Sequence, residues 1–363
     1  VARRLLAEVR PNDTVARIGG DEFVVACGDF VDDEQVLHLA DRLSDGLNRP
    51  AIIAGRVVDI SGSIGVAITR SPAHDPSNLL RAADLAMYRA KSSGRRRVGL
   101  FDEQLAHLAI DRLEVEADLQ DALRDERLVL HYQPIVDLRN DEVVAVEALL
   151  RYLRPGGELV EPGSFLHVAE ESGLIVPIGR WVMREACRQA ARWQEELNRP
   201  PQVSINLSGR QIADPDFRDT MLEALEETGV DPSLLCLEVT ETVFVDAPRS
   251  LIATIDVLKS RGLTLAIDDF GTGYSSLTYL KRLPVDRIKI DRSFTAGLAE
   301  DAEDRAIVAA VTGLGRQLDL SVVAEGVEST EQLELLRGLG CDLAQGFLFA
   351  SAVPPDALAA ILR

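Results

Sequence analysis

From about residue 128 onward, the chain alternates short apolar runs with segments of helical periodicity. The apolar runs have the length and composition of buried strands. They are Leu128–Val136, Val143–Leu150, Val203–Leu207, Leu235–Val239, Thr264–Ile267, Arg287–Ile290, Ser321–Ala324 and Leu343–Phe349. The segments between them favour helices, and one carries apolar residues at spacings of four, three and four: Ile307, Val311, Leu314 and Leu318.

The first two apolar runs are joined differently from the rest. Only residues 137–142 separate them, which is too short for a crossover, so these two strands should be antiparallel neighbours. The later strands have room for helical crossovers and should be parallel. The pattern predicts an α/β fold, a (β/α)8 TIM-like barrel with a reversed first strand.

The first hundred residues have a different organisation. Residues 1–10 suit a helix that ends before Pro11. Gly19 and Gly20 lie between two potential strands and indicate a hairpin tip, because glycine tolerates positive φ. We predict an α/β domain at 1–101, a connecting helix with a polar face at 102–127 that leads into the barrel, and the barrel at 128–363.

Charge and length limit the classes of function. The 363 residues favour two domains over one, and the net charge is −20, with 59 acidic and 39 basic residues. General binding to nucleic acid or to an anionic membrane requires a positive field, so we expect neither. No apolar run reaches the roughly 18 residues of a membrane span, and no signal peptide is visible.

The cysteines and the first residue bear on location. Four widely separated cysteines form no metal-type spacing and indicate reduced thiols in a cytoplasmic protein. They are Cys27, Cys187, Cys236 and Cys341. The chain starts at Val1 within a helical pattern, so we expect it to begin inside a domain of a parent chain that could carry N-terminal sensor or membrane segments.

Polar residues recur where the predicted barrel strands end. They are Glu147, Asn206, Glu238, Asp268, Asp269, Lys289, Asp291, Glu325 and Gln345. Barrels of this kind build their active sites at the carboxyl ends of the strands. A single residue of this set is most simply explained as a surface residue. Repetition over consecutive strands is hard to explain that way, and it favours a site.

The residue types indicate hydrolysis of a phosphodiester. Carboxylates with an amide oxygen form a hard cage suited to Mg²⁺ or Mn²⁺, and no histidine lies on these strand ends to suggest zinc. Two such ions can activate a water and hold the phosphate oxygens. Lys289, among carboxylates, can hydrogen-bond the attacking water and offset developing charge, although a structural salt bridge is the simpler alternative.

From roughly residue 114 to the end, the chain resembles EAL domains, the cyclic di-GMP phosphodiesterases. The resemblance rests on several motifs in the expected order. They are Glu147-Ala-Leu-Leu-Arg151, Ser204-Ile-Asn-Leu-Ser208, Glu238-Val-Thr-Glu241, Asp268-Asp-Phe-Gly-Thr-Gly-Tyr-Ser-Ser-Leu277, Ile288-Lys-Ile-Asp291, Ala324-Glu-Gly-Val-Glu328 and Gln345-Gly346. This resemblance implies metal-dependent hydrolysis of cyclic di-GMP to linear pGpG.

The same resemblance implies roles for single residues. The implied metal ligands are Glu147, Asn206, Glu238, Asp268 and Asp269. Lys289 would act on the nucleophilic water as the general base, and Glu325 would support the metal site; with Glu147 and Asp269 they form the catalytic set. The implied substrate contacts are Gln133, Arg151, Asp291 and Gln345. Glu241 would anchor the Gly271–Gly273 loop, which we expect to gate catalysis.

The first unit resembles GGDEF domains, the diguanylate cyclases that make cyclic di-GMP from GTP. The signature is Gly19, Gly20, Asp21, Glu22 and Phe23, and residues 61–66 and 83–95 resemble a family strand and late helix. Lys91 and Arg95 would face nucleotide phosphates, and Arg10 with Asp13 resembles the family's product-inhibition site. The family's first strand and helix, with another metal-binding Asp, would precede Val1. We therefore expect a partial domain that is regulatory or inactive here.

Two alternatives stay open beside the phosphodiesterase. One is a degenerate barrel that binds cyclic di-GMP without cutting it. The other is a bifunctional cyclase and phosphodiesterase in a longer parent chain, with GTP bound at a complete GGDEF domain. We expect cyclic di-GMP as the partner, no nucleic acid, no membrane segment within this chain, and a homodimer.

Overall fold

The computed structural model describes residues 1–20, 22–49, 51–53, 56–58, 62–70, 75–92, 98–101, 103–245, 249–271 and 284–362. Its contacts divide the chain into two compact units, Val1–Glu114 and Val115–Arg363. Each unit has a hydrophobic core of its own. Among the described residues, no helix combines the length and the apolar content that a membrane crossing requires.

The first unit contains short strands and three complete helices among its described residues. Its elements are α1 (Ala2–Glu8), β1 (Thr14–Gly19), β2 (Glu22–Ala26), α2 (Asp33–Asn48), β3 (Ala51–Ile53), β4 (Arg56–Val58), β5 (Ile64–Val66), α3 (Pro76–Ser92) and β6 (Val98–Leu100). β1 and β2 form the predicted antiparallel hairpin, with Gly20 at φ +50° in its turn. Among its described residues, Leu5, Leu39 and Leu43 form a buried apolar cluster. Helix α4 (Glu103–Arg124) follows and crosses the division between the units.

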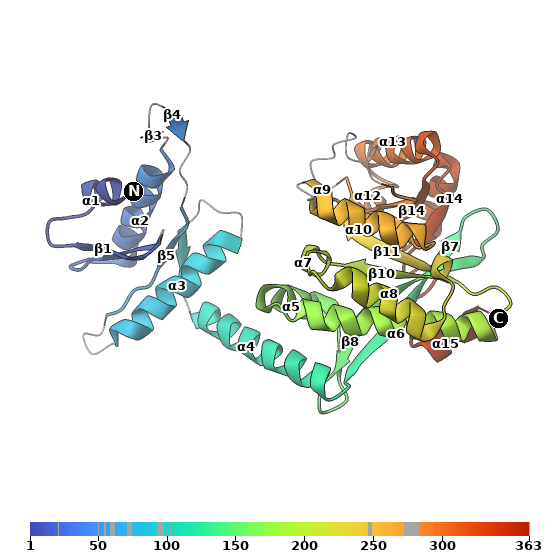
Figure 1. The fold of residues 1–363 in the computed structure, drawn as a ribbon. Coiled ribbons are helices and arrows are strands. Elements are labelled where there is room, and N and C mark those ends of the chain that lie inside the picture. Colours follow the sequence, from blue (N-terminus) through green and yellow to red (C-terminus); the bar gives the residue numbers. More distant parts are fainter. Residues whose placement is uncertain are drawn as a thin grey trace. The chain divides into compact units, whose positions relative to one another are not determined.

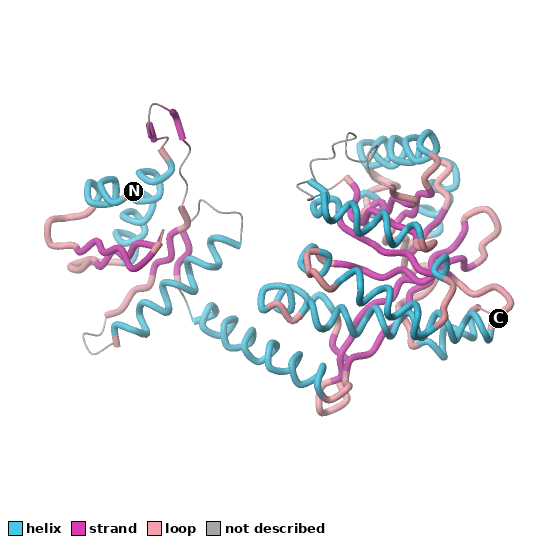
Figure 2. Tube along the Cα trace, in the orientation of Figure 1, coloured by secondary structure: helices cyan, strands magenta, loops and turns pink. Residues whose placement is uncertain are grey.

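The second unit is a closed eight-stranded barrel (Figures 1 and 2). Its strands are β7 (Leu128–Asp137), β8 (Val143–Leu153), β10 (Gln202–Leu207), β11 (Leu235–Thr240), β12 (Thr264–Phe270), β13 (Arg287–Ile290), β14 (Ser321–Ala324) and β15 (Leu343–Gln345). They pair in chain order, and β8 pairs with β10 to close the ring. β7 is antiparallel to β8 and β15, whereas the other barrel pairs are parallel. The structure therefore confirms the predicted barrel with a reversed first strand.

One predicted strand is too long. The sequence favoured a strand at Leu343–Phe349, but β15 ends at Gln345. The next residue, Gly346, lies so close to Val327 that an added Cβ would come within 2.1 Å of the Val327 carbonyl oxygen. The chain turns at this contact, and the apolar residues that follow do not continue the strand. A two-residue strand, β9 (Leu159–Val160), also extends β8 outside the barrel.

Helices surround the barrel strands in Figures 1 and 2. They are α5 (Leu166–Ser172), α6 (Ile175–Glu196), α7 (Gly209–Ile212), α8 (Phe217–Thr228), α9 (Glu241–Val245), α10 (Arg249–Ser260), α12 (Arg292–Ala296), α13 (Ala302–Leu318), α14 (Thr330–Leu339) and α15 (Pro355–Ile361), with 3₁₀ turns at Pro162–Ser164 and Pro232–Leu234. Apolar faces of these helices pack on the outward side chains of the strands, as Val308 and Val311 of α13 do. The main core is therefore the layer between helices and barrel.

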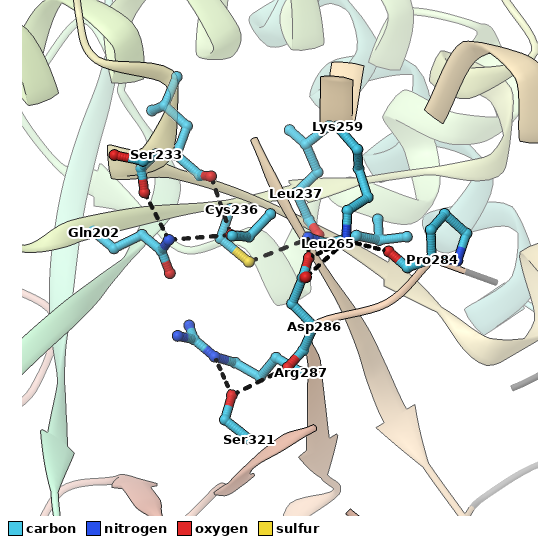
Figure 3. A network of polar contacts seen from close by, with 12 residues as sticks. Gln202, Ser233, Cys236, Leu237, Lys259, Leu265, Pro284, Asp286, Arg287 and Ser321 are labelled. Carbon is cyan, nitrogen blue, oxygen red and sulfur yellow. Dashed lines mark hydrogen bonds and ion pairs between the residues drawn. The ribbon is translucent and has the colours of Figure 1, made fainter. Parts of the chain in front are cut away.

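The amino ends of several strands are tied together by polar contacts (Figure 3). Lys259, in the last turn of α10, donates to the Pro284 carbonyl at 2.5 Å and to the Asp286 carboxylate at 2.7 Å. Asp286 in turn accepts from the Leu265 amide at 2.8 Å. Gln202 Nε2 donates to the Ser233 carbonyl at 2.9 Å and to Thr264 Oγ1 at 3.1 Å. This end of a (β/α)8 barrel generally serves stability, so we assign the network a structural role.

Candidate active site

The side chains that point into the barrel change from apolar to polar along the strands. On each of four strands, the polar residue lies two positions from the apolar one. Four residues from four strands form a buried apolar cluster: Ile135, Ala145, Val323 and Leu343. Two residues further toward the opposite end of the barrel, the same strands carry Gln133, Glu147, Glu325 and Gln345. Since strand residues two apart share a face, the apolar cluster forms a floor under a polar layer.

Lys289 lies at the centre of this polar layer. Its side chain is 1% exposed, and Nζ lies 2.5 Å from Glu238 Oε2 and 2.6 Å from Glu325 Oε1. Asp268 Oδ1 is 3.2 Å away and Glu147 Oε2 is 3.6 Å away. Burial alone lowers the pKa of Lys289, but the surrounding carboxylates outweigh burial and raise the pKa well above its ordinary value. Lys289 is therefore a charged hydrogen-bond donor in this site.

The carboxylates around Lys289 respond differently to burial. Burial raises the pKa of Glu238 to about 7 and that of Glu325 to about 8, against the opposing attraction of Lys289. Burial also acts to raise the pKa of Glu147, but Lys289 and the amides of Gln345 and Asn206 reverse that effect and lower it. The layer holds more acid than one ammonium can neutralise, which favours a further cation.

Glu147 is contacted at both carboxylate oxygens by amide groups. Asn206 Nδ2 donates to Oε1 at 2.5 Å, and Gln345 Nε2 donates to Oε2 at 2.6 Å. Gln345 Nε2 also donates to Gln133 Oε1 at 3.0 Å. The predicted metal ligands Glu147 and Asn206 are thus in contact. Gln345 and Gln133, which were predicted to contact substrate, lie beside them.

A bulge at the end of β12 brings Asp268 and Asp269 to one place. Consecutive strand residues normally point to opposite faces, but the pairing with β13 shifts register between Ile267 and Phe270, and Asp269 adopts φ +53°. As a result, Asp268, Asp269 and Glu325 each offer an oxygen within 4.8 Å of the others. The family resemblance gave Glu325 a supporting role at the metal site and a place in the catalytic set, and the structure puts it beside the Asp pair.

The described residues of the layer fit a divalent metal. The oxygen-rich group of Asp268, Asp269 and Glu325 has the ligand chemistry of Mg²⁺ or Mn²⁺. In addition, Glu238 Oε1 is buried and has no hydrogen-bond partner in the part of the chain that the structure describes. A buried carboxylate oxygen left without a partner is unfavourable, and a bound cation would satisfy it.

Other predicted site residues have local partners. Asp291 caps α12 by accepting from the Ser293 amide at 3.0 Å, and Ser293 Oγ also contacts it. The Asp-x-Ser spacing is a capping signal that is already visible in the sequence. Arg151 is buried on β8 and donates to its neighbour, the Leu150 carbonyl, at 2.9 Å. Glu241 begins α9, which lies next to β12; Gly273, in the loop it was predicted to anchor, is outside the described residues.

The first unit places its predicted residues around the β1–β2 hairpin and on α3. Gly19 ends β1, Glu22 and Phe23 begin β2, and Asp21 lies outside the described residues. The Arg10 amide donates to Asp13 Oδ2 at 2.7 Å. Lys91 is exposed in the last turn of α3, and Arg95 is not among the described residues.

Comparison with known proteins agrees with these two units. Residues 116–352 match the family model of the EAL domain, and residues 1–97 match that of the diguanylate cyclase, GGDEF domain. A bifunctional diguanylate cyclase/cyclic di-GMP phosphodiesterase of Pseudomonas aeruginosa, MucR, is 44% identical over 361 residues, 99% of this chain and 52% of that protein. The cyclic di-GMP phosphodiesterase NbdA of the same species is 38% identical over 363 residues, 100% of this chain and 46% of that protein.

A solved structure described as the PaMucR phosphodiesterase in complex with c-di-GMP is 46% identical, with a TM-score of 0.65. The match covers 68% of this chain and 99% of that one. The chain spans about half the length of the curated relatives it matches. From the family match, the barrel and these relatives together, the chain belongs to the EAL domain family, with a segment that matches the GGDEF domain in front of its barrel.

Proposed function

We propose that the barrel hydrolyses one phosphodiester bond of cyclic di-GMP to give linear pGpG, in a reaction that needs Mg²⁺ or Mn²⁺. The observation that carries the proposal is the buried layer in which Lys289 lies within 3.6 Å of Glu147, Glu238, Asp268 and Glu325. The solved cyclic di-GMP complex of a relative at 46% identity supports the choice of substrate.

The proposed metal ligands are the residues that the family resemblance named. They are Glu147, Asn206, Glu238, Asp268 and Asp269, with Glu325 beside the last two. Two bound ions would lower the pKa of a water and neutralise charge on the phosphate. Several carboxylates in one water-poor layer make that extra positive charge favourable even before substrate binds.

The chain's own residues have complementary tasks in the proposed reaction. The Lys289 ammonium donates a hydrogen bond to the attacking water and offsets charge that develops on the phosphate. The surrounding carboxylates raise the pKa of Lys289, which favours this role as a charged donor over the general-base role that the family resemblance implied. Arg151 would hold a phosphate oxygen. The attacking water would give up a proton to bulk solvent, its oxygen would bond to phosphorus as the bond from phosphorus to the 3′ oxygen breaks, and the 3′ oxygen would take up a proton from solvent.

The direct test is incubation of the whole chain with cyclic di-GMP and Mg²⁺ or Mn²⁺, followed by chromatography of the products. We expect pGpG with either ion and none when a chelator is present. Glu147→Ala should lower the rate by at least about 100-fold, as the loss of a catalytic electrostatic group does. Glu226→Ala, on the exposed face of α8, is the matched control and should retain full activity.

Two results would contradict this proposal. Tight binding of cyclic di-GMP without turnover at any metal concentration would make the barrel a receptor. Turnover that survives exhaustive chelation would show that hydrolysis does not need the metal.

A further inference from the structure

Two amide side chains contact the carboxylate of Glu147. Asn206 contacts one of its carboxylate oxygens and Gln345 the other, at 2.5 and 2.6 Å. Glu147 is 7% exposed and Gln345 4%, so water does not compete freely for these hydrogen bonds. A carboxylate with both oxygens held in this way keeps one orientation.

A backbone carbonyl sets the direction of this hydrogen-bond chain. The Ala350 carbonyl can only accept, so Gln133 must donate to it through Nε2, at 3.0 Å. Gln133 Oε1 then faces Gln345 and must accept from its Nε2, also at 3.0 Å. The second hydrogen of Gln345 Nε2 is directed to Glu147. Reversing either amide would place two acceptors against each other, so the chain has one consistent arrangement.

This arrangement leaves Gln345 no N–H donor for a substrate. A primary amide has two N–H donors, and Gln133 and Glu147 use both. Gln345 Oε1 is buried, without a partner in the described part of the chain. Gln133 is partly engaged as well, because one Nε2 hydrogen goes to the Ala350 carbonyl and its oxygen accepts from Gln345. It also lies directly opposite Glu147 in the pairing of β7 with β8.

We propose that Gln345 and Gln133 are positioning residues, which orient Glu147 for a divalent metal and do not read the substrate. This inference rests on the proposed function, since it takes Glu147 as a metal ligand. It replaces the substrate-binding roles that the family resemblance implied for both glutamines. The C-terminal segment at Ala350 thereby anchors a ligand from the second barrel strand.

The test compares Gln345→Met with Gln202→Met in the whole chain. Methionine has nearly the length of glutamine but cannot donate a hydrogen bond. Gln202 is the matched control, because it donates through Nε2 to two oxygens at the amino end of the same barrel. Calorimetric titration with Mn²⁺ in the absence of substrate measures metal affinity without requiring turnover.

We expect Gln345→Met to weaken Mn²⁺ binding by about 10–100-fold, as loss of a group that orients a metal ligand does. Gln202→Met should leave that affinity within about twofold. At saturating Mn²⁺, Gln345→Met should recover most of its kcat with little change in KM for cyclic di-GMP. Unchanged Mn²⁺ affinity combined with a raised KM would show that Gln345 contacts substrate, and it would overturn the inference.

Gln133→Met gives a second route if Gln345→Met does not fold. Its effect should be smaller and in the same direction, and the double variant should bind Mn²⁺ about as well as Gln345→Met alone, because both changes break one chain. Fully additive losses would contradict the chain. If the unmodified protein forms no pGpG, the proposed function is refuted but this inference is not, because the comparison of Mn²⁺ affinities needs no turnover. If the unmodified protein binds no Mn²⁺, this inference is refuted too.

Discussion

Lys289 is the cation that offsets the acidic layer before any metal binds. Its side chain is 1% exposed and has four carboxylates within 3.6 Å. Removal of one partner from a buried ion pair generally costs about 3–5 kcal/mol, since the other charges stay uncompensated. We therefore expect Lys289→Met to lower the Tm of the metal-free protein and to reduce turnover by at least about 100-fold.

Metal should rescue the stability of this variant but not its activity. With the competing ammonium gone, Mn²⁺ should raise the Tm of Lys289→Met by more than it raises that of the unmodified protein. Thermal unfolding over a Mn²⁺ series measures this, and an equal or smaller rise would contradict the role of Lys289. Lys259→Met is the control, because Lys259 pairs with Asp286 at the opposite end of the barrel, and its response to Mn²⁺ should be unchanged.

The sequence was enough to place the polar side chains on their strands, but it did not predict which of these side chains contact each other. The apolar runs placed Glu147, Glu238 and Lys289 on barrel strands, and the structure has them there, although β8 continues past Glu147 to Leu153. The engagement of Gln345 with Glu147 depends on distances across the barrel and on which hydrogens are already used. A single sequence gives neither the distances across the barrel nor the hydrogens that are already used.

The bulge of β12 is an element whose geometry the site requires. Gly271 follows Asp269 and Phe270 at φ +102°, and a Cβ added there would lie 3.0 Å from the Phe294 ring. Since L side chains rarely adopt this backbone conformation, Gly271→Ala should cost about 1–3 kcal/mol of unfolding free energy. Chemical denaturation measures it.

A glycine in a regular helix should respond in the opposite direction. Gly313 lies inside α13, and apart from its chain neighbours and the nearby backbone of that helix, an added Cβ would meet no described atom within 4 Å. Gly313→Ala should therefore stabilise the chain by about 0.4–1 kcal/mol, through lower entropy of the unfolded state. If Gly271→Ala proved as harmless as this control, the strain assigned to the end of β12 would be absent.

At the level of elements, connection length was the most informative signal. Six residues between the first two barrel strands excluded a crossover, and β7 is indeed antiparallel to β8. The length of β15 was wrong, because Phe347, Leu348 and Phe349 look like strand residues while the turn at Gly346 is enforced by Val327. Such a tertiary contact overrides local β-propensity.

At the level of the whole molecule, the two units differ greatly in the cores they build. Among the described residues, the barrel unit has a continuous core that reaches from Leu119 to Leu358, whereas the clustered buried leucines of the first unit are Leu5, Leu39 and Leu43. Buried apolar area is the main source of stability, so the barrel should unfold at the higher temperature. Compact units with separate cores commonly unfold separately.

We therefore expect two transitions in differential scanning calorimetry of the whole chain, and Mn²⁺ should shift only the upper one. A ligand at 100 times its Kd stabilises the unit that binds it by about 2.7 kcal/mol, and the acidic layer with its metal-capable group lies wholly within the barrel unit. Residues 115–363 alone should give one transition near the upper temperature, with the same response to Mn²⁺, and NaCl at matched ionic strength controls for screening. A single cooperative transition, or a Mn²⁺ shift of both, would mean that the stability of the first unit depends on the barrel. Metal binding in the EAL domain would then also stabilise the GGDEF-matching segment, without any new contact between that segment and the metal.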